Sequence, residues 1–312
     1  MKRVLKWLGA LVLFVFAVLI VFNWNSLDDG LRYVRDMLAY TSTPAKPLAA
    51  NGRFGFCQQY MTLRNAQRAQ FIQNYLDERN ISFQLLPIYD SGFNNIFVPI
   101  SASGPYTIFS AHYDKRYDDP EYQGASDNSA ADCLLLVAAE ELNKQQPTKP
   151  VAILFTGEEE VGLVGAKAFY EYATQNNLQV AQAVNLDNIG RAGLGSRASG
   201  ERSGYAFTIP LLGEFIYDGR TLAPALPYRQ PDASLLDQLS RVESLTRYDR
   251  MIAKSDATFW QVQGWNAVTL SSDDIYFLDI TWHTYGDRAE LLDEINFERA
   301  LNLVVGFARQ GS

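Results

Sequence analysis

Residues 151–160 read Val-Ala-Ile-Leu-Phe-Thr-Gly-Glu-Glu-Glu, five apolar side chains followed by a threonine, a glycine and three adjacent acids. A short apolar run that stops at a turn signal predicts a strand buried on both faces. The same pattern recurs at Tyr106–Ser110, which leads to His112, and at residues 179–186, which lead to Asp187. Each of these predicted strands is therefore followed by polar side chains that are candidates for catalysis or metal binding.

Further predicted strands and helices surround these runs. Strands are expected over residues 81–87 and 95–100, and helices over 57–79, 126–142 and 163–172. Strands that alternate with helices predict an α/β fold with a largely parallel sheet covered on both faces. The carboxyl ends of parallel strands meet at one edge, where ligands bind in open α/β sheets.

The predicted edge gathers several candidate functional residues. They include both histidines of the chain, since His112 and His283 are its only two. Taken singly, each has an ordinary explanation. His112 suits a structural histidine paired with Asp114, Asp127 suits a helix cap, and Glu158–Glu160 suit a solvated acidic turn. Their joint position at strand ends favours one functional site.

The charges of this cluster point to metal ions. Crowded carboxylates repel one another and raise their own pKa values. Two Zn²⁺ ions would remove that objection, because their four positive charges balance Asp127, Glu160, Asp187 and a bridging hydroxide. Two imidazoles would complete the ligand sets, and Asp114 lies two residues beyond His112, a spacing that suits a carboxylate orienting the imidazole.

Composition limits the class of protein. The 312 residues carry a formal net charge of -8, which argues against nucleic acid as a partner because phosphate binding needs clustered Lys and Arg. The two cysteines, Cys57 and Cys133, are too few for a disulfide scaffold. They could pair with each other or remain as buried free thiols.

The N-terminus differs from the rest of the chain. Residues 8–22 carry no charge, basic residues precede them, and Trp7 and Trp24 flank them. This pattern predicts a cytoplasmic N-terminus (1–6), a signal-anchor transmembrane helix (7–24) and a juxtamembrane linker (25–47) with a short helix over 28–40. No small-x-small cleavage site follows the run, although a cleaved signal peptide on a secreted protein is the alternative. We expect a single-pass inner or plasma membrane protein whose domain (48–312) is periplasmic or extracytoplasmic.

Five segments together resemble a known family, the co-catalytic di-zinc aminopeptidases of clan MH, metallopeptidase family 28. In chain order the motifs are His112-Tyr-Asp114, Gly124-Ala-Ser-Asp127-Asn-Ser-Ala130, Glu159-Glu-Val-Gly-Leu-Val-Gly165, Asn185-Leu-Asp187-Asn-Ile-Gly190 and His283-Thr-Tyr-Gly-Asp287. The resemblance implies a three-layer α/β/α fold of the zinc-exopeptidase type, with a mixed, mostly parallel central sheet.

The resemblance also implies residue roles. Asp127 would bridge two zinc ions, Glu160 and His283 would complete one site, and His112 and Asp187 the other. Glu159 would be the general base, and Asp114 would support catalysis through His112. The implied activity is removal of N-terminal residues from peptides with a free N-terminus, by attack of a metal-bridging hydroxide.

Two other functions remain open at this stage. Residues 112–120 and Cys133 also resemble the glutaminyl cyclases, single-zinc relatives that form N-terminal pyroglutamate. Many family members have Ser-Asp-His before the last strand, whereas this chain has Ser255-Asp256-Ala257. A non-catalytic binding ectodomain on the same fold is the third hypothesis, because a fold alone does not give function.

Overall fold

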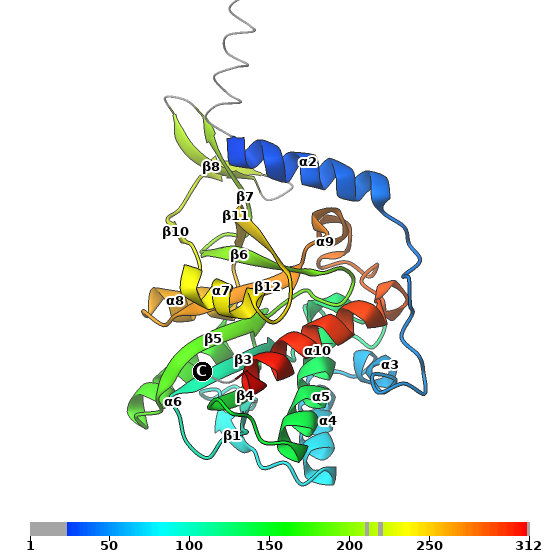
Figure 1. Cartoon of the computed structure of the whole chain (residues 1–312), viewed down its shortest axis with the longest axis vertical. Helices are drawn as coiled ribbons and strands as arrows, with labels where there is room; N and C mark the ends of the chain where they lie inside the picture. Colours follow the sequence, from blue (N-terminus) through cyan, green and yellow to red (C-terminus); the bar gives the residue numbers. More distant parts are fainter. Residues whose placement is uncertain (1–23, 210–211, 218–220, 311–312) are drawn as a thin grey trace, which may run out of the picture.

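The computed structural model describes residues 24–209, 212–217 and 221–310. A single mixed sheet runs through it, in the order β1-β2-β4-β3-β5-β12-β6-β11-β7-β8-β9, with β10 paired to β6. Figure 1 shows this sheet between its helices. The strands are β1 (Gln84–Pro87), β2 (Asn94–Pro99), β3 (Tyr106–His112), β4 (Val151–Thr156), β5 (Val180–Leu186), β6 (Leu194–Gly200), β7 (Gly204–Ile209), β8 (Gly213–Tyr217), β9 (Leu222–Pro224), β10 (Tyr228–Arg229), β11 (Leu245–Ala253) and β12 (Ala267–Ser272).

The sheet is mixed, as predicted, but the expectation that it is mostly parallel is wrong. The central strands β4, β3, β5 and β12 run parallel to one another, but β4 pairs antiparallel with β2, and β12 pairs antiparallel with β6. Of the eleven strand pairings among the described residues, four are parallel and seven antiparallel. The antiparallel pairs come mainly from the region after residue 190, where short hairpin strands replace the strand-helix-strand crossovers that parallel pairing requires.

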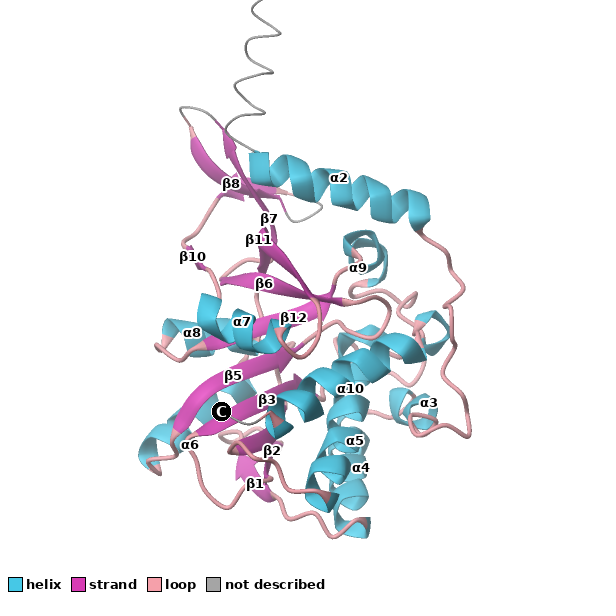
Figure 2. Ribbon diagram, in the orientation of Figure 1, coloured by secondary structure: helices cyan, strands magenta, loops and turns pink. Residues whose placement is uncertain are grey.

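Helices cover both faces of the sheet, which gives the three predicted layers (Figure 2). One apolar cluster joins five helices to the sheet, and a second joins two helices to the opposite face. On the first face lie α3 (Cys57–Met61), α4 (Asn65–Glu78), α5 (Ala130–Lys144), α7 (Ala233–Ser240) and α10 (Glu294–Arg309). On the second lie α6 (Val164–Gln175) and α8 (Asp256–Val262).

The single helix predicted over residues 57–79 is wrong, because the chain breaks between α3 and α4. Arg64 begins the second helix with an extended backbone, and its N–H donates to the Gln67 side chain. The break positions α4 so that the buried Arg68 guanidinium donates to the backbone carbonyls of Tyr113 and Gln123. These two contacts fix the loops on either side of the candidate site.

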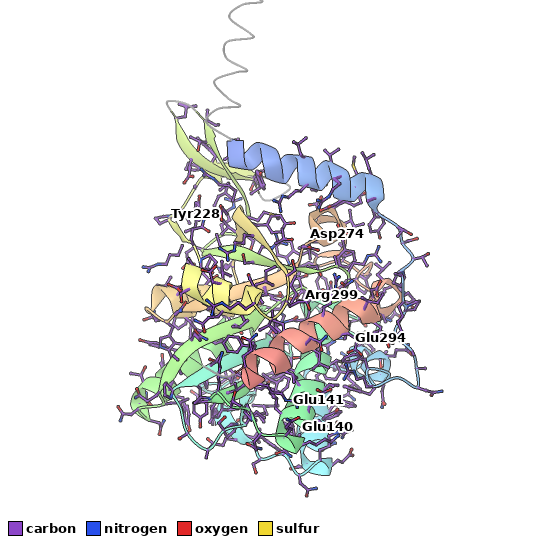
Figure 3. All side chains as sticks on the ribbon, viewed as in Figure 1. Glu140, Glu141, Tyr228, Asp274, Glu294 and Arg299 are labelled. Carbon is purple, nitrogen blue, oxygen red and sulfur yellow. The ribbon has the colours of Figure 1, made fainter. Side chains whose placement is uncertain are left out.

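Residues of the predicted juxtamembrane linker (25–47) pack against the domain. Its helix α2 (Trp24–Ala39) begins four residues before the predicted start and contacts α9 (Ile275–Thr281) and β11. Further along, Glu294, labelled in Figure 3, pairs with Lys46 at 2.7 Å and accepts from the Ala49 N–H.

No helix in the described residues is long and apolar enough to cross a bilayer. The predicted span over residues 7–24 lies, apart from Trp24, outside the part of the chain that the structure describes.

Replacing Trp260 by Ala tests the second apolar layer. The Trp260 ring is fully buried on α8, packs edge-on against Phe169 of α6, and donates its indole N–H to the Ala166 carbonyl. We expect Trp260→Ala to lower the free energy of unfolding by about 3–5 kcal/mol. Urea unfolding followed by circular dichroism measures this. Val262→Ala is the control on the same helix, where a half-exposed side chain predicts a change within about 0.5 kcal/mol.

Candidate metal centre

Three neighbouring strands deliver the candidate residues to one edge of the sheet. In the order β4-β3-β5, all three run parallel. His112 is the last residue of β3, Asp187 follows β5 directly, and Glu160 lies four residues beyond the end of β4. The buried runs seen in the sequence therefore place their polar endings side by side.

His112, Asp127 and Asp187 form the first group. The His112 Nε2 atom lies 3.2 Å from Asp127 Oδ1 and 3.6 Å from Asp187 Oδ1. All three side chains are buried. One donor atom from each lies within 4.8 Å of the others, which is close enough for all three to hold one ion.

The second group shares Asp127 with the first. The His283 Nε2 atom lies 3.3 Å from Asp127 Oδ2 and 3.2 Å from Glu160 Oε2. These three residues also meet the 4.8 Å criterion. The two oxygens of Asp127 thus face different imidazoles, one in each group. Of the three consecutive acids, Glu160 is the one that enters this second group.

Backbone amides hold Asp127 in place through Asp287. Asp127 lies in the π-helical turn η1 (Ala125–Ser129), at the start of α5. The Asp287 carboxylate accepts from the N–H of Ser126 at 2.8 Å, from the N–H of Asp127 at 3.0 Å and from the Ser126 hydroxyl at 2.8 Å. A carboxylate with three donors is strongly oriented, so Asp287 fixes the turn that presents Asp127.

Asp114 organises the loop that carries the acids. Its two carboxylate oxygens accept from the backbone N–H groups of Glu159 and Glu160, at 3.0 and 3.1 Å. The nearest acceptor to His112 Nδ1 is the backbone carbonyl of Asp114, at 3.0 Å, while the carboxylate lies 3.6 Å away. Asp114 therefore orients the imidazole mainly through its carbonyl and orients the acidic loop through its side chain.

The charges around the imidazoles favour their protonated forms. Burial alone would lower the pKa of His112, but Asp114, Asp127 and Asp187 raise it well above its usual range. Burial likewise opposes the charge on His283, yet Asp127 and Glu160 raise its pKa to about 9. Burial would raise the pKa of Asp127, and both imidazoles instead hold it below its usual range. The cluster therefore binds positive charge strongly.

Glu159 lies beside this cluster without belonging to either group. Burial raises its pKa well above the usual range, His112 opposes that shift, and the charges of Asp187, Asp256 and Glu160 add to it. Carboxyl groups with perturbed pKa values in such clusters are candidates for proton transfer.

The donor set and its unused atoms fit metal ions. Among the described residues, Glu160 Oε1 is buried with no hydrogen-bond partner, and Asp127 Oδ2 is buried and makes no hydrogen bond, although the His283 Nε2 atom lies 3.3 Å away. Buried carboxylate oxygens of this kind are costly unless a cation or a donor meets them. Imidazole nitrogen and carboxylate oxygen together are ligands that suit zinc. The residues present therefore fit two divalent ions that share Asp127.

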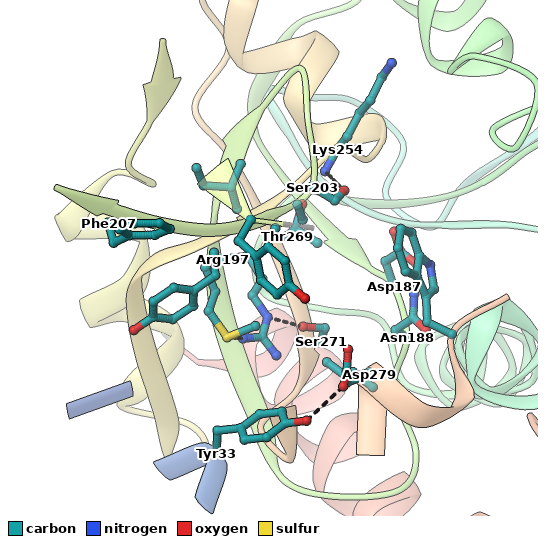
Figure 4. Close-up of a pocket in the computed structure, with 18 residues that line it drawn as sticks. Tyr33, Asp187, Asn188, Arg197, Ser203, Phe207, Lys254, Thr269, Ser271 and Asp279 are labelled. Carbon is teal, nitrogen blue, oxygen red and sulfur yellow. Dashed lines mark hydrogen bonds between the residues drawn. The ribbon is translucent and has the colours of Figure 1, made fainter. Parts of the chain in front are cut away.

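A cavity of about 740 Å³ opens beside Asp187 (Figure 4). Aromatic side chains from several elements line it, with Tyr33 from α2, Phe207 from β7 and Trp282 next to His283. The indole of Trp282 lies against the His283 ring, with centroids 4.3 Å apart. The cavity therefore connects the candidate metal centre to an apolar pocket of ligand size.

Comparison with known proteins agrees with this geometry. The sequence model of peptidase family M28 matches residues 95–308, which include every residue of both groups. The chain belongs to peptidase family M28. The zinc peptidases of this family are hydrolases, and this chain has the same mixed α/β fold.

Solved structures share the fold at low sequence identity. The LapA aminopeptidase of Legionella pneumophila is 16% identical, with a TM-score of 0.63 over 82% of this chain and 70% of its own. A leucine aminopeptidase precursor of Bacteroides thetaiotaomicron is 14% identical, with a TM-score of 0.59 over 86% of this chain and 100% of its own. The glutaminyl cyclase of Porphyromonas gingivalis is 14% identical, with a TM-score of 0.61 over 83% of this chain and 97% of its own.

A sequence relative carries a membrane protein's name. The vacuolar membrane protease of Vanderwaltozyma polyspora is 31% identical over 103 residues, which make up 32% of this chain. The match spans only 10% of that relative's own length.

Sequence reasoning assigned no role to two acids of this family M28 site. Asp287 was seen only as the end of the last motif, and Asp256 only as part of a segment that lacks a histidine. In the structure the buried Asp256 accepts from the Thr156 hydroxyl at 2.5 Å, and burial raises its pKa to about 7. The preserved Ser-Asp pair before the last buried strand is the signal that could have marked Asp256.

The structure shows whether the two cysteines, in α3 and α5, form a disulfide. Cys57 and Cys133 are both buried and both carry free thiols. The second of the two sequence alternatives therefore holds in this structure.

Asp114→Asn tests how the family M28 site is positioned. An amide offers one acceptor oxygen where the carboxylate offers two, so one of the N–H groups of Glu159 and Glu160 loses its partner. We expect peptidase turnover and metal affinity to fall about 10- to 100-fold with little change in melting temperature. Asp90→Asn, at an exposed turn, is the control and should leave turnover unchanged. Equal turnover in the two variants would refute the positioning role.

Proposed function

We propose that this chain is a membrane-anchored zinc exopeptidase, an aminopeptidase that removes N-terminal residues from peptides. The observation that carries the proposal is the position of Asp127, whose two carboxylate oxygens face two different imidazoles at 3.2 and 3.3 Å. A single carboxylate shared in this way suits two ions side by side. Site completeness also argues against a binding module, which needs no such arrangement.

The proposed ligand set contains five residues of this chain. His112 and Asp187 would hold one Zn²⁺, Glu160 and His283 would hold the other, and Asp127 would bridge them. When bound, the two ions supply Lewis-acid activation of the water and of the scissile carbonyl. The imidazoles must be neutral to serve as ligands, so metal binding would displace the protons that the carboxylates otherwise hold there.

Glu159 moves the proton in the proposed reaction. Its carboxylate takes a proton from the attacking water and returns it to the nitrogen of the leaving amine. Asp114 fixes the Glu159 backbone through the hydrogen bond at 3.0 Å. Glu159 must stay outside the ligand set, because a carboxylate that is bound to an ion loses its power to accept the proton.

The substrate's two recognition elements follow from charge and shape. A free α-ammonium group is attracted by the carboxylates of the site, and a chain with a net charge of -8 favours a cationic N-terminus over an anionic group. The adjoining cavity would take the first side chain, and its aromatic walls favour an apolar or aromatic one.

Membrane anchoring is the second part of the proposal. The uncharged run over residues 8–22 and its flanking tryptophans support an anchor over 7–24, with the domain (48–312) on the periplasmic or extracytoplasmic side. The name of the vacuolar membrane protease is consistent with association of such domains with membranes.

A glutaminyl cyclase is the alternative function. The observation that favours it is the cyclase of Porphyromonas gingivalis, whose fold is matched over 97% of its length. A cyclase needs one zinc, which Asp127, Glu160 and His283 would hold here, and it uses the substrate's own amine as the nucleophile. His112 and Asp187 would then have no metal to hold.

Glu159→Gln tests the proposed base. Glutamine keeps the shape of the side chain but cannot accept the proton, so we expect kcat to fall by at least about 10²-fold with zinc content unchanged. Glu158→Gln is the matched control one residue earlier, and it should keep near-normal turnover. Loss of zinc from the Glu159 variant would show that Glu159 is a ligand and that the assignment is shifted by one residue.

Metal stoichiometry separates the two enzymes and the binding module. On the aminopeptidase proposal, chelation abolishes cleavage of leucyl or alanyl anilides, and full recovery needs two zinc equivalents per chain. Asp187→Ala should retain one zinc and lose most of the turnover. Recovery with one equivalent, with pyroglutamate release from N-terminal glutamine and no anilide cleavage, would instead establish the cyclase. A folded chain that binds no zinc would establish the binding module.

A further inference from the structure

Helix α2 turns three of its polar side chains toward the protein. Tyr33 donates its hydroxyl to Asp279 at 2.9 Å, Arg32 lies over the Tyr248 ring at 5.5 Å, and Asp36 is buried. A surface helix normally turns its apolar stripe inward and its charged side chains to water. Between residues 31 and 38 of α2 this arrangement is reversed, except that Arg35, paired with Asp36 at 2.7 Å, is exposed as well.

The opposite face of α2 is apolar and exposed. Leu31, Val34 and Leu38 are 61%, 45% and 78% exposed, and Met37 beside them is also exposed. Their spacing of three and four residues places the first three along one stripe of the helix. We call these four residues the outer stripe. Within the described part of the chain, nothing covers it.

A second exposed apolar group lies at the same end of the molecule. Leu212 and Leu222, on the ribbon formed by β7, β8 and β9, are exposed. Tyr217 at the end of β8 lines the same cavity as Tyr33 of α2, so the ribbon and the helix are neighbours. Figure 1 shows both at one end of the molecule, at the top of the view.

The sequence before α2 bears on what could cover this face. The uncharged run over residues 8–22 ends two positions before Trp24, the first residue of α2. A helix that starts at the end of a membrane anchor begins at the bilayer surface. Its exposed apolar stripe can then lie in the plane of the interface, as amphipathic helices do, with leucines among the lipid chains.

We propose that the outer stripe of α2 lies in the interface of a lipid bilayer and holds the domain against the membrane. Tyr33, on the inner side of the same helix, lines the cavity next to Asp187. Because a helix with its side chains is about 10–12 Å across, the cavity lies within roughly that distance of the lipid. The inference rests on the proposed anchor over residues 7–24 but not on the peptidase activity.

Lipid quenching tests this contact on the full chain. Leu31→Cys, Val34→Cys and Leu38→Cys variants are labelled with an environment-sensitive fluorophore and reconstituted in phosphatidylcholine–phosphatidylglycerol vesicles. The vesicles contain lipid with a nitroxide near the headgroup. The unsubstituted chain gives the background, because Cys57 and Cys133 are buried. Lys144→Cys, at the exposed end of α5, is the labelled control.

We expect at least about twofold quenching at the three stripe positions and almost none at residue 144. In the Val34→Cys background, adding Leu31→Ser and Leu38→Ser should remove most of the quenching, while flotation with vesicles and turnover of a soluble anilide stay unchanged. Because neither leucine belongs to the candidate metal centre, lipid quenching is the measurement that tests the contact, and turnover serves as the control.

Three results would overturn the proposal, and each has a different meaning. A full chain that fails to float with vesicles refutes both the anchor and the membrane contact. Flotation with a label that reports water refutes the contact alone. Blue-shifted emission without lipid quenching, rising with the ratio of protein to lipid, shows that a second copy of the chain covers the stripe. Anilide turnover, measured separately, tests the proposed peptidase function.

Discussion

The crowding of carboxylates at one edge of the sheet is the constraint on which the site depends. Asp127, Glu160 and Asp187 meet there with two imidazoles, and Glu159 and Asp256 lie close enough for their charges to interact. Like charges held together in a buried place cost free energy unless cations or protons balance them. The raised pKa values of His112 and His283 have this cause, because the surrounding carboxylates favour positive charge on the imidazoles.

Two further carboxylates in this region have a structural role. Asp287 and Asp114 point at backbone N–H groups, and each accepts from two consecutive residues of the segments that carry Asp127 and Glu160. Hydrogen bonds to a charged acceptor are strong and directional. Asp287 and Asp114 therefore hold the segments that present Asp127 and Glu160 to the candidate metal centre. The positions of these two candidate ligands are fixed by hydrogen bonds within the chain.

The sequence predicted the parts of the fold that repeat a local pattern. The apolar runs predicted β3, β4 and β5. Because the ends of neighbouring parallel strands lie side by side, the residues that follow these runs, His112, Glu160 and Asp187, could be predicted to meet. The break at Arg64 was missed because apolar residues keep their helical spacing across it, while the capping that ends the pattern comes from Gln67.

Long-range contacts were beyond a local pattern. Asp287 acts on Ser126, 161 positions away in the chain, so no spacing rule points to it. The antiparallel half of the sheet was missed for a related reason. Its strands β7 to β9 are short and half exposed, so that their sequence resembles that of loops.

The orientation of α2 could not be predicted either, because amphipathic spacing gives a helix an apolar face but not the direction in which that face points. Tyr33 settles the direction through its hydrogen bond to Asp279, which turns Leu31 and Leu38 away from the protein. The same bond makes α2 a wall of the cavity, so that whatever holds the outer side of this helix also sets the shape of the pocket on its inner side.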